Sequence, residues 1–344
     1  MKFIIYNLGC KVNSYESNVM TENLENAGYI LTDKVEDAAI AIVNTCSVTN
    51  TADSKSLKTL RQVKKNNPNI ILIACGCLAQ VNSGVIKEKT NADIIIGNIG
   101  KSKIVDIIKN YLRDKNSIED IKDIMHSSFE TMQLNNFDKT RAFVKIQDGC
   151  NNFCSYCIIP YTRGNVRSKP KDDVIKEVKE LIKSGHQEIV LAGIHTGHYG
   201  SEFKDYDFAD LLNELVKIDG LLRLRISSIE IVELNDKFLE VLKNNKVLVD
   251  HLHIPLQSGS DPILKAMNRR YNLEYYENKI KEIRKIRPNI SISTDVIVGF
   301  PGETKELFEE TIATVKRLQF SKIHVFPYSR RKGTKADLMP NQVD

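Results

Sequence analysis

Clustered cysteines are the residues of this sequence whose type and spacing point most directly to chemistry. Three of the seven cysteines, Cys150, Cys154 and Cys157, fall within the segment C-N-N-F-C-S-Y-C. An odd number of cysteines in a long chain without a secretory signal argues against a framework of disulfides. Thiols grouped in this way indicate a metal centre or catalysis instead.

The spacing of this first group, C-x3-C-x2-C, allows three thiolates of one short loop to meet at one metal centre. Structural zinc is the main alternative, but it prefers four protein ligands, and no fourth Cys or His follows nearby. Ferredoxin-type sites also supply a fourth cysteine. Three ligands on a four-iron cluster leave one iron open to a small molecule, and the spacing favours this interpretation.

Three further cysteines, Cys10, Cys46 and Cys77, each come just after a predicted strand. They are 36 and 31 residues apart, and each interval corresponds to one strand–helix unit. Strands related in this way run parallel, so we expect the three thiols to emerge at one edge of a sheet. The alternative is three small buried hydrophobic residues, and the residues alone leave this choice open. We expect Cys75 to pack within its strand.

Alternating strand and helix patterns must position both groups of cysteines. In the N-terminal part, apolar runs separated by amphipathic segments predict a parallel-sheet α/β domain over residues 1–113. The predicted strands cover 3–8, 39–44, 69–74 and 92–97, and the predicted helices cover 14–26, 50–65 and 101–113.

A polar segment at 114–139 is interpreted as a linker, and the alternation resumes over 140–344. Six strand–helix units predict a partial (β/α)6 barrel. Functional sites in such folds lie at the carboxyl ends of the strands, which is where the first cysteine group follows its strand. The six predicted strand cores cover 142–147, 188–192, 222–227, 251–255, 290–298 and 323–327.

Composition limits the class of protein. The chain has 49 Lys and Arg against 44 Asp and Glu, a net charge of +5, and 42% hydrophobic residues. These values exclude a disordered or collagen-like chain. No apolar run approaches the roughly 18 residues of a membrane helix. The apolar run near the N-terminus is too short for the core of a signal peptide. We therefore expect a cytoplasmic protein, and the mild positive charge permits nucleic acid as a partner.

The first cysteine group, with Phe153 and Tyr156 beside it, resembles the radical S-adenosylmethionine (SAM) superfamily. The resemblance implies a [4Fe-4S] cluster whose open iron is chelated by the amino and carboxylate groups of SAM. It also implies that one electron from the cluster cleaves SAM to methionine and a 5′-deoxyadenosyl radical. A partial barrel of six strand–helix units is the fold expected for that superfamily.

Nearly the whole chain resembles the methylthiotransferases of this superfamily. The resemblance implies that Cys10, Cys46 and Cys77 hold a second, auxiliary [4Fe-4S] cluster that takes part in sulfur delivery. The supporting motifs include N-L-G-C-K-V-N, N-T-C-S-V-T, G-C-L-A-Q, R-I-S-S-I-E, H-I-P-L-Q-S-G-S, T-D-V-I-V-G-F-P-G-E-T and F-P-Y-S-R-R-K-G-T.

Two of these motifs also bear on the substrate. C-K-V-N-S-Y-E-S and C-S-V-T-N-T-A-D-S-K-S are similar to the branch that modifies threonylcarbamoyladenosine in tRNA. This favours 2-methylthiolation of N6-threonylcarbamoyladenosine 37. Isopentenyladenosine in tRNA and a ribosomal-protein aspartate are the alternative substrates within the family. A zinc-stabilised RNA-binding module and an electron-transfer protein are the alternatives outside it.

Residues near the predicted strand ends are candidates for binding SAM or RNA. An ion pair with a neighbouring strand is the alternative for Arg225, and a plain tight turn is the alternative for Gly299. His195 and His198 are candidate bases or RNA contacts, or ordinary polar groups. The SAM candidates are Phe153, Tyr156, Gly193, Arg225, Ser227, Gln257 and Gly299, and the RNA candidates are Arg163, Arg167, Arg330 and Arg331.

The resemblance also implies cofactors and partners. It implies two [4Fe-4S] clusters, two SAM molecules per turnover, tRNA, an electron donor such as flavodoxin or ferredoxin, and a sulfur source. We expect a monomer that does not bind membranes. Relatives usually continue into a small β-barrel RNA-binding domain, called TRAM, and this sequence stops at Asp344 before it. We therefore expect that domain to be absent and tRNA binding by this chain to be weak.

Overall fold

The chain forms two compact units. The computed structural model describes residues 1–137 and 139–343. The first unit comprises Met1–Phe137 with Asp148–Cys150 and Ile158–Asn165, and the second comprises the remaining residues from Asp138 onward. Asp138, in the predicted linker, and Asp344, at the end of the predicted barrel range, lie outside the described residues.

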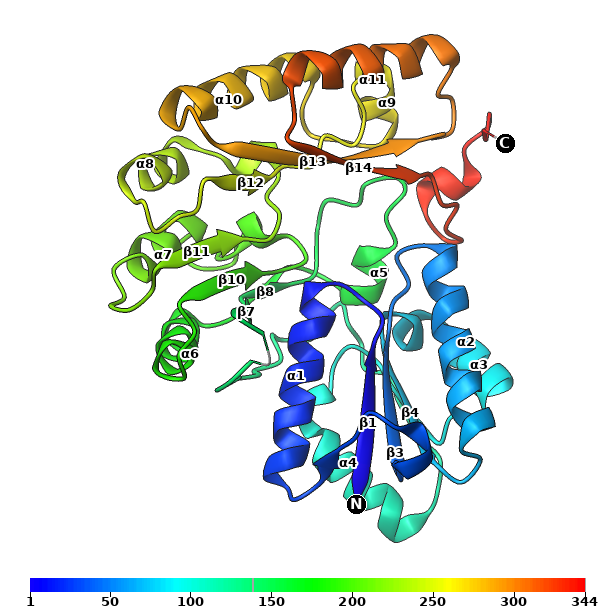
Figure 1. Cartoon of the computed structure of the whole chain (residues 1–344). Helices are drawn as coiled ribbons and strands as arrows, with labels where there is room; N and C mark the ends of the chain where they lie inside the picture. Colours follow the sequence, from blue (N-terminus) through cyan, green and yellow to red (C-terminus); the bar gives the residue numbers. More distant parts are fainter. Residues whose placement is uncertain (138, 344) are drawn as a thin grey trace. The chain divides into compact units, whose positions relative to one another are not determined.

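A parallel sheet with strand order β2-β1-β3-β4-β5-β6 organises the first unit. All six residues of β3 are buried, which is typical of a central parallel strand covered on both faces. Figure 1 shows β1, β3 and β4 between the helix pair α1 and α4 and the pair α2 and α3. The strands are β1 (Lys2–Asn7), β2 (Ile30–Leu31), β3 (Ile40–Thr45), β4 (Ile71–Gly76), β5 (Ile94–Ile96) and β6 (Ile118–Asp120), and the helices are α1 (Lys11–Asn26), α2 (Asn50–Asn66), α3 (Cys77–Thr90), α4 (Ile104–Asp114) and α5 (Ile159–Arg163).

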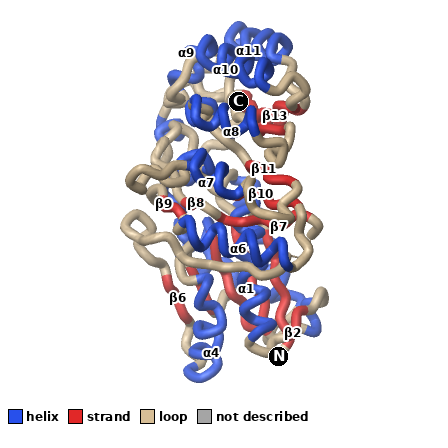
Figure 2. The backbone as a smooth tube through the Cα atoms, turned by 90° about the vertical axis from the view of Figure 1, so that its left-hand side faces the viewer, coloured by secondary structure: helices blue, strands red, loops and turns tan. Residues whose placement is uncertain are grey.

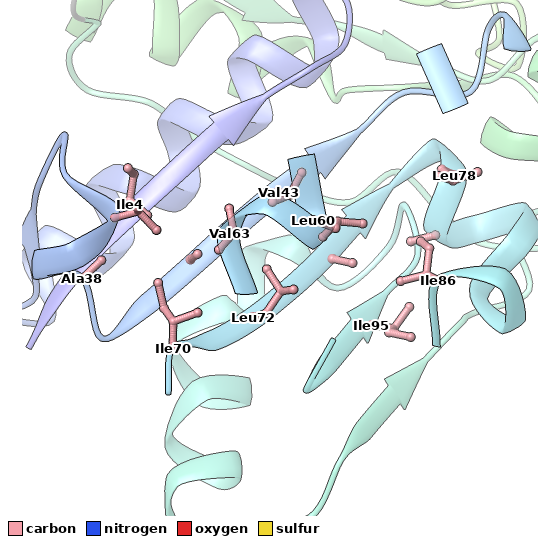
Figure 3. Packing of buried hydrophobic residues seen from close by; sticks show 14 residues of the cluster. Ile4, Ala38, Val43, Leu60, Val63, Ile70, Leu72, Leu78, Ile86 and Ile95 are labelled. Carbon is pink, nitrogen blue, oxygen red and sulfur yellow. The ribbon is translucent and has the colours of Figure 1, made fainter. Parts of the chain in front are cut away.

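Two apolar layers hold the helices of this unit to its sheet. On one face, Ile4, Val43 and Leu72 from the strands pack with Leu60 and Val63 of α2 (Figure 3). The opposite layer joins other strand residues to α1 and α4. Burial of each such aliphatic side chain stabilises the folded state by about 1.5–3 kcal/mol. These layers therefore hold the strands, and the cysteines that follow them, in fixed positions.

The main strands of the first unit match the predicted pattern, and the short edge strands do not. β2 and β6 were not predicted, because they contain only two and three residues and remain largely accessible. β6 lies within the segment that we interpreted as a linker, and it pairs in parallel with β5.

The second unit is a partial barrel built from two parallel three-stranded sheets. Their strand orders are β11-β10-β7 and β12-β13-β14, and an isolated bridge from Leu224 to Leu248 connects the β11 and β12 regions. The six predicted strands and the α/β class are therefore confirmed. The strands are β7 (Arg141–Lys145), β9 (Arg167–Ser168), β10 (Glu188–Ala192), β11 (Arg223–Ile226), β12 (His251–His253), β13 (Ser291–Val298) and β14 (Lys322–Pro327), and the short β8 (Gln147–Asp148) has one residue in each unit.

Helices follow these strands and cover the outside of the partial barrel. α6, α7, α8 and α10 are packed in chain order, as Figure 2 shows along the second unit. No helix formed by the described residues is long and apolar enough to cross a membrane. The helices of this unit are α6 (Lys171–Lys183), α7 (Phe208–Leu215), α8 (Asp236–Asn244), α9 (Asp261–Ala266), α10 (Leu273–Ile286) and α11 (Lys305–Leu318).

Candidate metal centres and their surroundings

The carboxyl ends of three adjacent parallel strands carry the candidate centre formed by Cys10, Cys46 and Cys77. Cys10 follows β1 and is the N-cap of α1, Cys46 directly follows β3, and Cys77 follows β4 and begins α3. The order β1-β3-β4 makes these strands direct neighbours. The predicted arrangement of these three cysteines at one sheet edge is therefore present in the first unit.

The three thiols influence one another electrostatically. The pKa of Cys46 is raised to about 11, mainly by burial, and negative charge at Cys77 and Cys10 contributes to this increase. Desolvation by the surrounding protein also raises the pKa of the Cys10 thiol, although the residue as a whole is exposed. The positive charge of Arg163 lowers this pKa, and negative charge at Cys77 raises it. Thiols coupled in this way are stable as thiolates only when a cation or metal centre compensates their charge.

The spacing of these thiols is wider than one small ion requires. Zinc bound to thiolates at about 2.3 Å brings sulfur atoms to within about 3.8 Å of one another. Within residues 1–137 and 139–343, the groups of three or more ligand atoms that lie within 4.8 Å of one another contain histidine and carboxylate, and no cysteine. A cluster of several iron atoms holds its thiolates further apart, so the donor set fits a cluster better than one zinc ion.

A buried polar network lies beside the cysteines. Glu16 Oε1 is 2.6 Å from Arg163 Nη1, and Glu16 Oε2 is 2.5 Å from Lys101 Nζ. All three side chains are fully buried. Asn98 accepts a hydrogen bond from Lys101 (2.9 Å) and donates one to Cys77 Sγ (3.6 Å). Asp148 Oδ2 also lies 3.3 Å from Arg163 Nη1, so the network places two buried cations and two carboxylates beside the thiols.

Asn13 connects the same network to Cys10. Its Oδ1 accepts from Arg163 Nη2 at 2.9 Å and from Cys10 Sγ at 3.4 Å, and its amide donates to Asn44. Gly76, just before Cys77, has φ +98°, and a Cβ there would lie 2.6 Å from Asn44 Oδ1. The glycine is thus required by its backbone conformation and by the packing of Asn44.

Cys75 has a different environment from the other three cysteines of the first unit. It belongs to the apolar layer that contains Phe3, Met20 and Leu24. Burial raises its pKa to about 12. Cys75 therefore packs in the core, as predicted.

The candidate centre with the C-x3-C-x2-C spacing lies in the loop after the first barrel strand. Cys150 belongs to the first unit, where its amide donates to Gly164 O at 3.0 Å, and Cys154 and Cys157 belong to the second. Cys157 N–H donates to Cys154 O at 2.9 Å, which forms a tight turn between the last two cysteines. Ser155 N–H donates to Met267 O at 3.0 Å and holds the turn against the segment after α9.

Arg269 is a residue of this centre that sequence reasoning missed. Its Nη1 donates to Cys154 Sγ at 3.3 Å, and its Nη2 forms an ion pair with Glu230. Burial alone would lower the pKa of Arg269, but the negative charge of Glu230 keeps it well above the usual range. The guanidinium is therefore a permanent positive charge in contact with the Cys154 sulfur. The adjacent basic pair in N-R-R-Y was the available signal.

The predicted SAM contacts have varied surroundings. Arg225 forms an ion pair with Glu188 of the neighbouring strand β10 at 3.0 Å, which is the structural alternative considered above. Ser227 Oγ lies 3.1 Å from Thr196 Oγ1, and a Cβ on Gly193 would lie 3.0 Å from Gln147 Oε1.

The remaining SAM candidates lie in turns or in an aromatic contact. Phe153, Gln257 and Gly299 have φ values of +47°, +66° and +73°, so each occupies a left-handed turn position. Tyr156 packs edge-on against Phe300 with ring centroids 6.4 Å apart.

His195 and His198 converge on a carboxylate. Their rings stack with centroids 3.8 Å apart, and Nε2 of His198 lies 3.4 Å from Glu233 Oε1, which also contacts His195 Nε2. Burial lowers the His195 pKa to about 4 and raises the Glu233 pKa to about 7. Near pH 7 the His195 imidazole is therefore neutral while Glu233 is about half ionised, and Glu233 is a partner that the sequence did not reveal.

Most of the predicted RNA-contacting arginines are not available at the surface. Arg163, Arg167 and Arg331 are buried, and a buried guanidinium does not meet an RNA phosphate. We assign Arg163 to the network behind the cysteines instead. The side chain of Arg330 is 60% exposed and is paired with Asp337 at 2.6 Å, so it keeps its place as a candidate. Charge runs in the sequence did not distinguish these environments.

Two family models match the chain. Residues 144–315 match the radical SAM superfamily, and residues 2–97 match the uncharacterized protein family UPF0004. The two matches include both cysteine groups.

Curated relatives are similar over nearly the full chain. A threonylcarbamoyladenosine tRNA methylthiotransferase, MtaB, from Bacillus subtilis (strain 168) is 44% identical over 98% of this chain and 76% of the relative. MtaB from Aquifex aeolicus (strain VF5) is 38% identical over 98% and 82%. A tRNA-2-methylthio-N(6)-dimethylallyladenosine synthase from Clostridium perfringens (strain SM101 / Type A) is 37% identical over 99% and 78%.

Solved structures share the fold at low sequence identity. The radical SAM methyltransferase TsrM from Kitasatospora setae superposes with a TM-score of 0.70 at 13% identity, covering 97% of this chain and 73% of that one. The cobalamin-dependent radical SAM enzyme OxsB gives 0.62 at 12% identity, covering 98% and 54%. These structures share the fold alone, whereas the curated relatives at 37–44% identity and the radical SAM family model show that the chain belongs to the radical SAM methylthiotransferase family.

Proposed function

We propose that this protein adds a 2-methylthio group to N6-threonylcarbamoyladenosine 37 of tRNA. The observation that carries the proposal is the set of thiols at the ends of β1, β3 and β4, in a chain that has a separate C-x3-C-x2-C loop. The relative at 44% identity is named for this substrate, which favours it over the dimethylallyladenosine of the relatives at 37%.

In this proposal each group of cysteines holds one [4Fe-4S] cluster. Cys150, Cys154 and Cys157 would hold the first, and Cys10, Cys46 and Cys77 the auxiliary one. When bound, the first cluster supplies the electron that cleaves SAM to the 5′-deoxyadenosyl radical. Two SAM molecules per turnover, a reduced flavodoxin or ferredoxin and a sulfur source complete the reaction. We expect the enzyme to act as a monomer in the cytoplasm.

The residues around the thiols would stabilise negative charge. Arg269 donates directly to Cys154 Sγ and is held in place by Glu230. At the other centre, Asn98 donates to Cys77 Sγ, and Lys101 orients Asn98 through its Oδ1. Hydrogen bonds to cluster sulfurs and nearby positive charge both raise a cluster's reduction potential. These residues therefore favour uptake of an electron.

Cysteine variants test the two-cluster part of the proposal. Anaerobically reconstituted wild type should contain about eight irons per chain, and Cys10→Ala and Cys154→Ala should each contain about four. Cys154→Ala should release no 5′-deoxyadenosine from SAM, whereas Cys10→Ala should release it without forming the methylthio product. Cys75→Ala is the matched control, because Cys75 packs in the core, and it should keep all of the iron. Stoichiometric zinc without iron in wild type would contradict the proposal.

A comparison of tRNA substrates tests the choice of nucleoside. Reconstituted enzyme, reductant and SAM are mixed with tRNA that carries either threonylcarbamoyladenosine or isopentenyladenosine at position 37. We expect the methylthio product only from the first. Product from the second alone would move the enzyme to the other branch of the family and leave the cluster assignment intact.

A further inference from the structure

We propose that His253, Asp295 and His324 form a binding site for one divalent metal ion, separate from both groups of cysteines. The three residues come from the three neighbouring strands β12, β13 and β14 of the second unit. Neither the cysteine chemistry nor the residues around Cys154 involve them.

Strand register places the three side chains on one face. Asp295 pairs with His324, and His253 pairs with Ser293, two positions before Asp295 on β13. Since side chains alternate along a strand, Ser293 and Asp295 share a face with their partners. Thr294, between them, donates to Ile254 O at 2.7 Å, and Tyr276 of α10 donates to the same oxygen at 2.8 Å, so Thr294 lies on the face that α10 covers. The His and Asp side chains therefore project from the face opposite α10.

The ligand atoms are already close together. Asp295 Oδ2 is 3.1 Å from His253 Nε2, and Asp295 Oδ1 is 3.2 Å from His324 Nδ1. One ligand atom from each residue lies within 4.8 Å of the other two. A tetrahedral zinc ion with ligands at 2.0–2.2 Å separates those ligands by about 3.3–3.6 Å. Small side-chain adjustments would therefore allow an ion to bind.

The second nitrogen of His253 is held as it is in metal sites. His253 Nδ1 lies 2.9 Å from Ser293 Oγ, which leaves Nε2 directed at Asp295. Metal-binding histidines usually have their other ring nitrogen fixed by such a partner, which sets the orientation of the ring. His251 lies 3.1 Å from the same hydroxyl, so three of the chain's seven histidines gather here.

The donor set indicates the class of metal. Two imidazoles and one carboxylate suit a borderline divalent ion such as zinc or ferrous iron, and three protein ligands leave positions for water or an oxygen ligand. The other compact group, at His195, His198 and Glu233, lies in another part of the second unit and is not part of this proposal.

Zinc counting on the loaded enzyme tests the site. Protein with both cysteine groups filled with iron and sulfide is passed over a chelator and dialysed against Zn²⁺ at increasing concentration. Bound zinc is then measured by mass spectrometry. We expect about one zinc per wild-type chain, loss of that zinc in Asp295→Asn, and affinity weaker by roughly 10- to 100-fold in Ser293→Ala. Iron content should not change.

A second His–Asp pair provides the control. His126 Nδ1 is 2.7 Å from Asp123 Oδ2, but this pair is exposed and has no third ligand in the groups named above. His126→Gln should therefore bind zinc like wild type. If Asp295→Asn fails to fold, Ser293→Ala and His324→Gln on the edge strand β14 carry the test. The proposal is overturned if wild type binds no zinc, or if wild type and these variants bind it equally.

Discussion

Removing the charge of Glu16 is predicted to destabilise the first unit strongly. Glu16→Gln removes the carboxylate that contacts the fully buried Arg163 and Lys101 at 2.6 and 2.5 Å. Arg163 keeps a contact with Asp148 Oδ2 at 3.3 Å, so the charge that loses its compensation is that of Lys101. Breaking a buried ion pair by removing one partner costs about 3–5 kcal/mol, because an uncompensated charge stays in the interior. At 1.4 kcal/mol per factor of ten, transient unfolding should become roughly 100- to 4,000-fold more frequent.

Cys75 provides the assay. It is fully buried in the apolar layer between the sheet and α1, so a thiol reagent reaches it only when the unit opens. The labelling rate of Cys75 is followed by peptide mass spectrometry in iron-free protein under native conditions. The predicted increase in opening appears directly as an increase in this rate.

An exposed ion pair of the same unit is the control. Lys2 and Asp37 are 3.3 Å apart, and both side chains are about half exposed. Pairs of this kind contribute about 0–1 kcal/mol, so Asp37→Asn should accelerate labelling less than about sixfold. If Glu16→Gln accelerates labelling no more than Asp37→Asn, the reasoning about the buried network is refuted.

Three further predictions concern the ends of elements and the barrel. Thr49→Ala removes the side chain that caps α2 by accepting a hydrogen bond from Ala52 N at 3.1 Å. Urea unfolding should show that the free energy of unfolding falls by about 0.5–2 kcal/mol, and an unchanged free energy would show that the cap does not stabilise the helix. Burial raises the Glu233 pKa from 4.5 to about 7, so its proton is held more tightly in the folded state and wild-type stability declines through this residue between those pH values. Glu233→Gln should therefore gain stability relative to wild type from pH 5 to pH 8, and a constant difference in urea midpoint would contradict this. Arg269→Met removes the positive charge beside Cys154 and should lower the cluster's reduction potential by on the order of tens of millivolts in a redox titration, whereas an unchanged potential would show that the contact has no electrostatic role.

The positions of the cysteines were predictable because parallel topology alone determines them. A cysteine that follows each of three strands must emerge at one edge when the strands are parallel neighbours, and the structure has β1, β3 and β4 side by side. The six barrel strands were also predictable, since their apolar cores are long. β2 and β6 were missed because pairs and triplets of residues carry no readable periodicity.

Long-range polar contacts could not be predicted from the sequence. Arg163 and Glu16 are 147 positions apart, and Arg269 and Cys154 are 115 apart. In the sequence, Arg163 stands in a basic run that looks like a solvated surface, and only the fold buries it. The same holds for Glu233, whose contact with His195 depends on the loop after β10 and the turn after β11.

The central claim is tested most directly by the modified nucleosides of tRNA. Total tRNA from cells that lack the gene, and from the same cells after the gene is restored, is digested and its nucleosides are analysed by mass spectrometry. The account predicts that 2-methylthio-N6-threonylcarbamoyladenosine is absent from cells without the gene and returns when the gene is restored. N6-threonylcarbamoyladenosine without the methylthio group should accumulate in the cells that lack the gene. If the level of this methylthio nucleoside does not change, the account is contradicted.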